Sequence, residues 1–133
     1  MKSLFISIIL LMISTSFLTA QDTYSTRLIA VDSIVKQIQE KSDQYIVLNT
    51  GPVEDIQGSI HIGPVEQDKY FQILELELEK LDSSKTIVVY CGCCPIVVCP
   101  NIDPAVLLLE RHGFTVRVLN LQEGIDEIGR AHV

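Results

Sequence analysis

The chain has 133 residues, of which 47% are hydrophobic, and a formal net charge of −7. This length predicts a single domain. Its basic residues are few and scattered, so it lacks the basic stripe that phosphate backbones require, and we expect no nucleic-acid partner. A domain of this size buries a sizeable core without staples, so we expect it to fold without a metal. We also predict no cofactor and no metal ligands.

The first twenty residues are predicted to be a secretory signal peptide rather than part of the fold. Lys2 gives a cationic start, residues 4–18 are almost wholly apolar, and Ala20 precedes a polar stretch. This order is typical of a leader that is cleaved after Ala20. We therefore expect an exported protein, periplasmic or extracellular, with a flexible N-terminus over residues 21–26 and one domain over residues 27–133. After the leader no apolar run is long enough to span a membrane.

Beyond the leader, short apolar runs alternate with amphipathic segments. In the first half we predict an apolar run at 28–31, a helix from an Asp32–Ser33 cap to about Lys41, strands at 45–48 and 59–62, and a helix at 68–81 capped by Asp68. In the second half we predict a strand at 86–90, a helix from an Asp103 cap to Arg111 with Gly113 as its C′ residue, a strand at 115–119 and a short helix at 124–128. About five strands with helices between them predict an α/β fold, in which a central, mostly parallel sheet carries helices on its faces.

Four cysteines, Cys91, Cys93, Cys94 and Cys99, fall within one window of nine residues. A secreted domain that is stapled by disulfides spreads its cysteines to close long loops, so this spacing favours site chemistry. Cys91 directly follows the predicted strand at 86–90, and the loop after it leads to a helix N-terminus, which favours an anion. We therefore predict that Cys91 is the reactive thiolate and that its pKa is lowered.

Several segments resemble the rhodanese (sulfurtransferase) domain. The strand at 86–90 followed by Cys91, and the Arg-His-Gly-Phe-Thr-Val stretch at 111–116, are similar to the family's catalytic strand end and to its helix closing with Gly-Phe. Residues 56–62 are similar to its His-Ile-Pro-Gly-Ala-Ile-Asn-Ile segment, and residues 119–128 to its Leu-x-Gly-Gly-Ile-x-x-Trp ending. The resemblance covers nearly the whole mature chain. It implies a rhodanese-like three-layer fold with helices on both faces of the sheet, and a sulfurtransferase that carries sulfane sulfur as a persulfide on Cys91.

The loop after Cys91 departs from the family pattern Cys-x-x-Gly-x-Arg-Ser. It is about five residues longer and lacks the arginine and the serine, and Asn49-Thr50-Gly51 replaces the family's Asp-x-Arg. The predicted active-site loop consists of Gly92, Cys93, Cys94, Pro95, Ile96, Val97, Val98, Cys99, Pro100 and Asn101. The resemblance implies a small sulfur donor and a thiol or protein acceptor as partners. Without the anion-binding arginine, we expect weak activity with thiosulfate.

The same cysteines leave alternatives open. Cys93, Cys94 and Cys99 are candidate resolving thiols, any of which would convert a Cys91 persulfide into a disulfide and release sulfide. The Cys-x-x-Cys pair at 91 and 94 leaves open a thiol–disulfide redox protein. Four thiolates also leave open a metal-binding module, although zinc sites generally use two separated cysteine pairs. A phosphatase is excluded, because its Cys-x₅-Arg motif would need arginine where Val97 stands.

Overall fold

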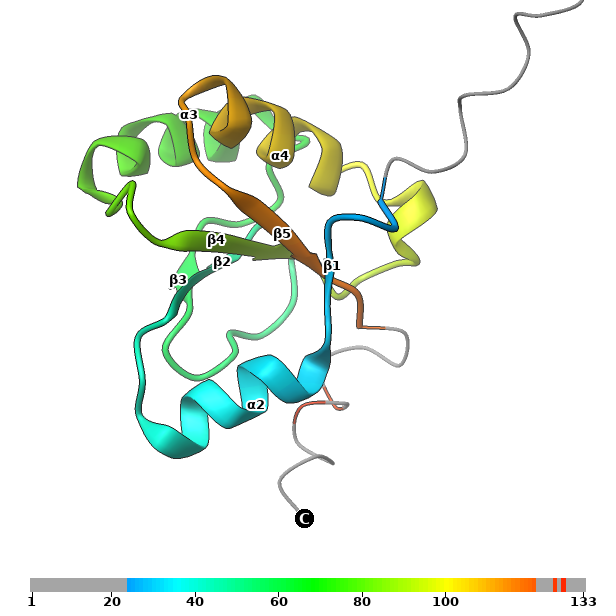
Figure 1. Ribbon diagram of the computed structural model, residues 1–133. Coiled ribbons are helices and arrows are strands. Elements are labelled where there is room, and N and C mark those ends of the chain that lie inside the picture. Colours follow the sequence, from blue (N-terminus) through cyan, green and yellow to red (C-terminus); the bar gives the residue numbers. More distant parts are fainter. Residues whose placement is uncertain (1–23, 122–125, 127, 129–133) are drawn as a thin grey trace, which may run out of the picture.

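The computed structural model describes residues 24–121 together with Asp126 and Ile128 (Figure 1). The leader predicted over residues 1–20 lies outside the described residues, as does most of the short helix predicted over residues 124–128. Residues 24–27 form a turn in which the backbone N–H of Arg27 donates to the Tyr24 carbonyl at 2.9 Å. Within the described part of the chain, no helix is long and apolar enough to cross a membrane.

Five parallel strands form the central sheet, in the order β1-β5-β4-β2-β3. They are β1 (Leu28–Ile29), β2 (Tyr45–Asn49), β3 (Ile60–His61), β4 (Thr86–Tyr90) and β5 (Val116–Leu119). Strands β2 and β4 pair over their whole length, from Tyr45 opposite Thr86 to Asn49 opposite Tyr90. The predicted α/β fold is confirmed. Because the strands are parallel, their carboxyl ends meet at one edge of the sheet, where ligands bind in open sheets of this kind.

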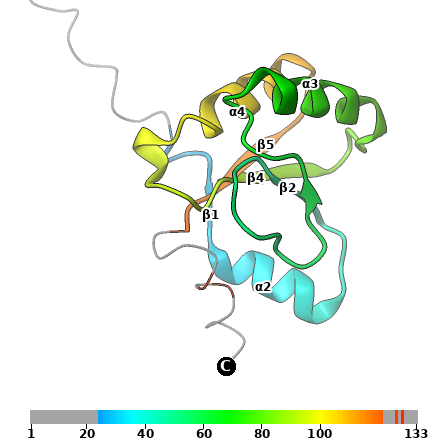
Figure 2. The same ribbon diagram turned by 180° about the vertical axis from the view of Figure 1, so that it is seen from behind.

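Helices cover both faces of the sheet, as predicted. The helical elements are α2 (Val31–Glu40), α3 (Asp68–Glu77), the 3₁₀ turn η1 (Leu78–Lys80), the 3₁₀ turn η2 (Ile96–Val98) and α4 (Ile102–Arg111). Figure 1 shows α3 and α4 on one face of the sheet and α2 on the other. Figure 2 shows that the long connection between β2 and β3 runs on the α2 side, where Val53 and Ile56 join the core.

Alternation along β4 assigns its side chains to two separate cores. Ile87 and Val89 pack in the cluster that includes α3 and α4, whereas Val88 and Tyr90 pack in the cluster that includes α2. All four side chains are fully buried, as the continuous apolar run of a strand with both faces covered requires. Cys91 continues the alternation, so its side chain lies on the α3 and α4 face.

The predicted helix caps are wrong by one residue for Asp68 and by two residues for Asp32 and Asp103. Asp32, Asp68 and Asp103 each lie in the first turn of their helix, and the N-cap positions are taken by Ala30, Gln67 and Asn101. None of these three N-cap side chains makes a capping hydrogen bond. The aspartates instead place negative charge beside the positive end of the helix dipole, which stabilises a first turn without a side-chain cap. At the other end of α4, Gly113 has a φ of +83° and follows the helix as predicted.

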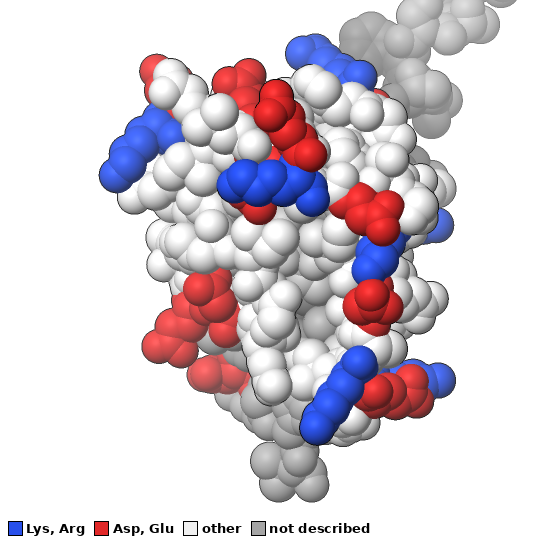
Figure 3. Space-filling model, turned by 90° about the vertical axis from the view of Figure 1, so that its left-hand side faces the viewer, with Lys and Arg blue, Asp and Glu red and all other residues white. Residues whose placement is uncertain are grey.

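Charged side chains of both signs are interspersed on the surface. Figure 3 shows one face on which lysines and arginines lie among aspartates and glutamates, with no continuous stripe of either sign. Exposed ion pairs include Lys85–Asp43 at 2.6 Å and Lys80–Glu77 at 2.7 Å. Pairs of this kind contribute little to stability because water screens them.

Candidate functional site

The candidate site lies at the carboxyl edge of the sheet, where β4 ends in Cys91. The Cys91 side chain is only 3% exposed and belongs to the core beneath α4. The chain then runs through residues 92–100, including η2, before α4 begins at Ile102. Figure 2 shows this loop leaving the end of β4, passing through η2 and continuing into α4. The loop that holds the other three cysteines therefore lies between the end of β4 and the start of α4.

The loop brings all four cysteine sulfurs together. The Cys91 sulfur lies 3.0 Å from that of Cys93, and the Cys93 sulfur lies 3.2 Å from that of Cys94. Including Cys99, the four sulfur atoms all lie within 4.8 Å of one another. Cys91 and Cys99 are buried, Cys94 is half-buried and Cys93 is exposed, and all four are free thiols. A group of this composition and spacing can hold a thiophilic metal ion or exchange sulfur among its members.

The neighbouring thiols distinguish Cys91 from the other cysteines. Hydrogen bonding from the Cys99 thiol lowers the pKa of Cys91 to about 5, against the opposing effect of burial, and Cys93 and Asn101 add further donors. Burial raises the pKa of Cys93 to about 12, and its hydrogen bonds to Cys91 and Cys94 act in the same direction. Donation to Cys91 also raises the pKa of Cys99. The cluster thus concentrates its negative charge on the Cys91 sulfur. The resulting thiolate is the reactive form of a cysteine.

Asn101 fixes the position of the Cys91 sulfur from the α4 side. Its side-chain Nδ2 donates to Cys91 Sγ at 3.3 Å, and its Oδ1 accepts from the backbone N–H of Glu66 at 3.0 Å. Asn101 is only 2% exposed, so both ends of its amide are satisfied inside the protein. In the predicted loop it is the one non-cysteine side chain with a hydrogen bond to the Cys91 sulfur, and the backbone N–H of Cys93 donates to the same atom.

Two glycines allow the backbone to pass close to Cys91. A Cβ atom on Gly51 would lie 2.6 Å from Cys91 Sγ and closer still to the Cys91 carbonyl oxygen. Gly92 has a φ of +70°, which side chains rarely tolerate, and a Cβ there would lie 2.8 Å from Val53 Cγ2. The chain after β2 therefore forms one wall of the site, directly against the cysteine.

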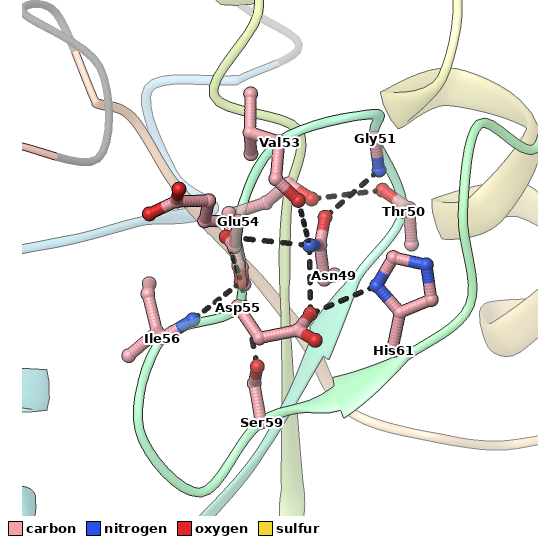
Figure 4. Close-up of polar contacts among 10 residues, drawn as sticks. Asn49, Thr50, Gly51, Val53, Glu54, Asp55, Ile56, Ser59 and His61 are labelled. Atoms are coloured by element: carbon pink, nitrogen blue, oxygen red, sulfur yellow. Dashed lines mark hydrogen bonds and ion pairs between the residues drawn. The ribbon is translucent and has the colours of Figure 1, made fainter.

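A buried amide holds that wall in place. Asn49 Nδ2 donates to the Val53 carbonyl at 2.8 Å and to Asp55 Oδ1 at 2.9 Å, and Asn49 Oδ1 accepts from the Gly51 N–H at 3.1 Å (Figure 4). The Asp55 carboxylate also contacts Nδ1 of His61 at 2.9 Å, on the exposed side of the network. Asn49 stands where the family resemblance would place the aspartate of Asp-x-Arg, and its amide folds the loop after β2 instead of facing a ligand.

Tyr90 and Thr50 couple this wall to the strand that carries Cys91. The Tyr90 hydroxyl accepts from the backbone N–H of Ile56 at 2.8 Å and donates to the Glu54 carbonyl at 3.3 Å. The Tyr90 carbonyl accepts from the backbone N–H of Thr50 at 2.9 Å and from its hydroxyl at 3.1 Å. The residue before Cys91 is therefore held at both its backbone and its side chain.

The rest of the predicted loop has two kinds of residue. Gly92 and Ile96 are half-buried, and Ile96 packs against the core together with Cys94. Pro95 and Pro100 are exposed, and Val97 and Val98 on η2 are 78% and 69% exposed. The structure thus brings the four cysteines and Asn101 together and leaves the two valines on the surface beside them.

Sequence reasoning missed three contributors to the site. The close approach of Gly51, the amide network of Asn49 and the hydroxyl of Tyr90 had no predicted role. In the sequence, the Asn49-Thr50-Gly51 stretch differs from the family pattern but does not itself indicate these contacts. The position of these residues at the carboxyl end of a predicted buried strand was the available indication, because parallel strands bring such ends to one edge.

No family model and no curated protein matches the chain. The crystal structures that resemble its fold include three that we describe by their alignment with the chain. A Lactobacillus plantarum protein aligns with a TM-score of 0.60 and 17% identity over 100% of this chain and 97% of its own. A full-length protein from the same organism aligns with a TM-score of 0.60 and 19% identity over 97% and 95%, respectively. A Bacillus halodurans protein aligns with a TM-score of 0.60 and 20% identity over 79% and 72%. At these identities the similarity shows a shared fold alone.

Proposed function

We propose that this protein is an exported, rhodanese-like sulfurtransferase that moves sulfane sulfur through a persulfide on Cys91. The observation that carries this proposal is the set of donors around one sulfur. Cys91 Sγ has hydrogen bonds with Cys93 and Asn101 at the carboxyl end of β4, and the Cys99 sulfur lies within 4.8 Å of it. The family resemblance of the sequence places its nucleophile at the same strand end.

The reaction takes place in two displacement steps. In the first, the Cys91 thiolate attacks the outer sulfur of a donor persulfide, R–S–S⁻. The new Cys91 S–S bond forms as the donor S–S bond breaks, and the electron pair leaves on R–S⁻. In the second, an acceptor thiolate R′–S⁻ attacks the outer sulfur of the Cys91 persulfide and becomes R′–S–S⁻, which restores the Cys91 thiolate. No external oxidant or reductant is consumed.

The surrounding donors stabilise the negative charge through both steps. A persulfide on Cys91 is an anion, and the Asn101 amide and the Cys93 backbone N–H, both donors to the Cys91 sulfur, remain beside it. Fixed donors directed at a developing charge lower the barrier without reorganisation. The N-terminus of α4, which begins directly after Asn101, adds its favourable dipole.

The loop suits an organic persulfide or a polysulfide better than a compact dianion. Residues 91–101 contain no lysine or arginine, and the exposed positions on η2 are Val97 and Val98. An apolar rim contacts a hydrocarbon or peptide donor favourably but gives a doubly charged donor no counter-charge. The acceptor is a thiol, either small or on a protein.

Cys93 is a candidate resolving thiol whose sulfur lies 3.0 Å from that of Cys91. Its attack on the inner sulfur of a Cys91 persulfide would form a Cys91–Cys93 disulfide and release hydrogen sulfide. The pKa of Cys93 is raised to about 12, so this residue is a thiol near neutral pH. Because the thiolate is the attacking form, transfer to an external acceptor is favoured over internal resolution.

A single-turnover mass measurement tests the proposal. The reduced protein is incubated with polysulfide in the absence of oxygen, the excess donor is removed, and the intact mass and the modified peptide are determined. We expect the mass of one added sulfur atom on Cys91, and its loss when a thiol acceptor is added. Cys91→Ser should abolish the adduct, and Cys93→Ser, the matched control in the same loop, should retain it. Persulfide on another cysteine, with Cys91→Ser still active, would overturn the proposal.

Export is tested separately. The full-length chain is expressed in a bacterial host, and the N-terminal peptide of the protein in the periplasmic fraction is sequenced. We expect a mature N-terminus at Gln21, which follows the predicted cleavage after Ala20. Full-length protein confined to the cytoplasmic fraction would contradict export and leave the chemistry of Cys91 to its own test.

A further inference from the structure

We propose that the four-cysteine loop is also a mononuclear zinc site, in which Cys91, Cys93, Cys94 and Cys99 bind one Zn²⁺ as thiolates. Zinc in structural sites is tetrahedral, and four cysteine thiolates are among its usual ligand sets. In such a site each bound thiol gives up its proton and donates an electron pair to the metal. No oxidation or reduction takes place.

The sulfur positions fit a single ion. Zn–S bonds of about 2.3 Å at tetrahedral angles separate neighbouring sulfurs by roughly 3.8 Å. The closest pairs in the loop are 3.0 Å and 3.2 Å apart, and no pair exceeds 4.8 Å. Side-chain adjustments of an ångström or less would therefore bring the four sulfurs to the distances of a tetrahedral site. A multi-iron cluster spreads its cysteines over several metal atoms and would need a wider set of sulfurs.

The backbone reaches this arrangement without strain at any ligand. Among the described residues, Lys41 is the only non-glycine residue with a positive φ, so none of the four cysteines has one. The sharp turn between Cys91 and Cys93 is made by Gly92, with a φ of +70°. The spacing of the ligands also includes the short separations that zinc sites use, with two residues between Cys91 and Cys94 and four between Cys94 and Cys99.

Outer hydrogen bonds and an entry path complete the site. The side chain of Asn101 donates to the Cys91 sulfur, and its backbone N–H donates to the Cys99 sulfur. Donors of this kind orient metal ligands and stabilise their charge. Cys93 is exposed and Cys94 is half-buried, so an ion can reach the two buried sulfurs through the two accessible ones.

Zinc and sulfur transfer would compete for the same atom. The electron pair on Cys91 that attacks a sulfur donor is the pair that a bound Zn²⁺ would hold. Only this competition rests on the proposed function; the coordination itself rests on the positions of the four sulfurs. A metal-loaded protein should therefore be protected from thiol reagents and inactive in sulfur transfer. A chelator should restore its reactivity toward thiol reagents and its sulfur transfer.

A cobalt titration tests the coordination directly. The reduced, metal-free protein is titrated with Co²⁺ in the absence of oxygen, and the visible and near-ultraviolet spectrum is recorded. We expect one Co²⁺ per chain, with intense tetrahedral ligand-field bands and sulfur-to-cobalt charge-transfer bands that bleach when one equivalent of Zn²⁺ is added. Octahedral Co²⁺ without charge-transfer bands would overturn the proposal, whatever the outcome for sulfur transfer.

Single substitutions identify the ligands. Cys93→Ser changes an exposed side chain and leaves the core intact, and it should weaken Zn²⁺ binding by more than tenfold and alter the cobalt bands. Cys94→Ser should act in the same way. Val97→Ser, a matched control on an exposed residue of the same loop, should leave both unchanged. If both cysteine variants keep the parental spectrum and affinity, the four-thiolate site is wrong.

Discussion

The side chain of Asn101 joins the Cys91 sulfur to the backbone of Glu66. One end of its amide donates to Cys91 Sγ at 3.3 Å, and the other accepts from the Glu66 N–H at 3.0 Å. Because both ends are occupied and the residue is buried, the amide has one favourable orientation. Asn101 occupies the N-cap position of α4 without capping it, so its side chain serves the cysteine site instead of the helix.

Replacement of Asn101 by aspartate should raise the pKa of Cys91. Asn101→Asp keeps an acceptor for the Glu66 N–H but removes the donor to Cys91 and places a like charge beside the thiolate. A like charge at this range disfavours ionisation, so we expect the pKa of Cys91 to rise by at least about one unit. The measurement is the pH dependence of Cys91 alkylation, resolved by peptide mass spectrometry.

Asn101→Ala separates the two roles of this amide. It removes the donor without adding charge, so the pKa of Cys91 should rise less than in Asn101→Asp. It also leaves the Glu66 N–H without its partner, which should lower the free energy of unfolding by about 1–3 kcal/mol. An unchanged Cys91 pKa in both variants would show that Asn101 does not stabilise the thiolate.

In the unmodified protein, Cys91 should react as a thiolate well below neutral pH. Its pKa is lowered to about 5 by donors from the neighbouring thiols, so the thiolate predominates above that pH and is protonated below it. The rate of Cys91 alkylation by iodoacetamide should therefore be halved near pH 5 and level from about pH 7 upward. A rate that still climbs tenfold per pH unit between pH 6 and pH 8 would indicate an ordinary thiol.

Gly51→Ala should disturb the site through a steric clash. The new methyl group would lie 2.6 Å from Cys91 Sγ, so either the cysteine or the loop after β2 must move. We expect sulfur transfer to fall by more than tenfold, since such a shift also disturbs the donors around Cys91. Gly58→Ala is the matched control. It is strained by a φ of +82°, but its methyl group meets nothing within 4 Å, so it should lower stability and leave Cys91 reactivity unchanged.

Tyr90→Phe should destabilise the loop that faces the cysteines. The substitution removes the acceptor of the Ile56 N–H, which is buried together with the tyrosine ring. We expect a loss of about 1–3 kcal/mol in the free energy of unfolding, measured by urea denaturation. Tyr45 is a half-buried tyrosine whose hydroxyl has no hydrogen bond within the described part of the chain. Tyr45→Phe should therefore lower the free energy of unfolding by less. Equal losses in the two variants would contradict a special role for the Tyr90 hydroxyl.

The fold was predictable where side-chain pattern alone decides the structure. The run from Thr86 to Tyr90 is β-branched and apolar, and it forms a strand with the predicted bounds. The ends of the helices were not predictable in this way. Asp103-Pro104 is typical of a helix start with Asp103 as the cap, yet α4 begins at Ile102, because packing of its buried side chains against the sheet extends the helix by two residues. Local capping preference is weaker than tertiary packing.

Only those features of the site that lie within one short segment of the chain were predictable from the sequence. Cys91 and its loop follow from one strand end and nine residues of sequence. The close approach of the Gly51 backbone to Cys91 depends on pairing between β2 and β4, and the Asn101 hydrogen bond to the Cys91 sulfur depends on the approach of α4. No periodicity or spacing within one segment reports such contacts, since each joins residues that are far apart in the chain or held by opposite sides of a loop.

Metal removal should leave the protein folded. The two cores contain the sheet and its three helices, and most of their side chains come from outside the cysteine loop. Cys99 and Cys91 are already packed as thiols, so the domain does not need zinc to close its core. Treatment of zinc-loaded protein with a chelator should lower the thermal midpoint only modestly and preserve the far-ultraviolet circular dichroism. Unfolding on chelation would show instead that the metal is structural.

Thiosulfate should be a poor sulfur donor compared with a persulfide or polysulfide. Thiosulfate carries two negative charges, and arginine is the residue best suited to hold such an oxyanion through paired N–H donors. The loop from Cys91 to Asn101 contains neither arginine nor lysine, and the exposed residues of η2 are valines. The amide of Asn101 is already committed to Cys91 and Glu66, which leaves backbone N–H groups as the remaining donors for the sulfonate. We therefore expect kcat/KM for thiosulfate to be at least about tenfold below that for an organic persulfide, which corresponds to about 1.4 kcal/mol of transition-state stabilisation. The comparison is made with one enzyme preparation, one thiol acceptor and fixed ionic strength, with Cys91→Ser as the blank for each donor. Equal values for the two donors would mean that the longer loop supplies its own oxyanion site from backbone groups.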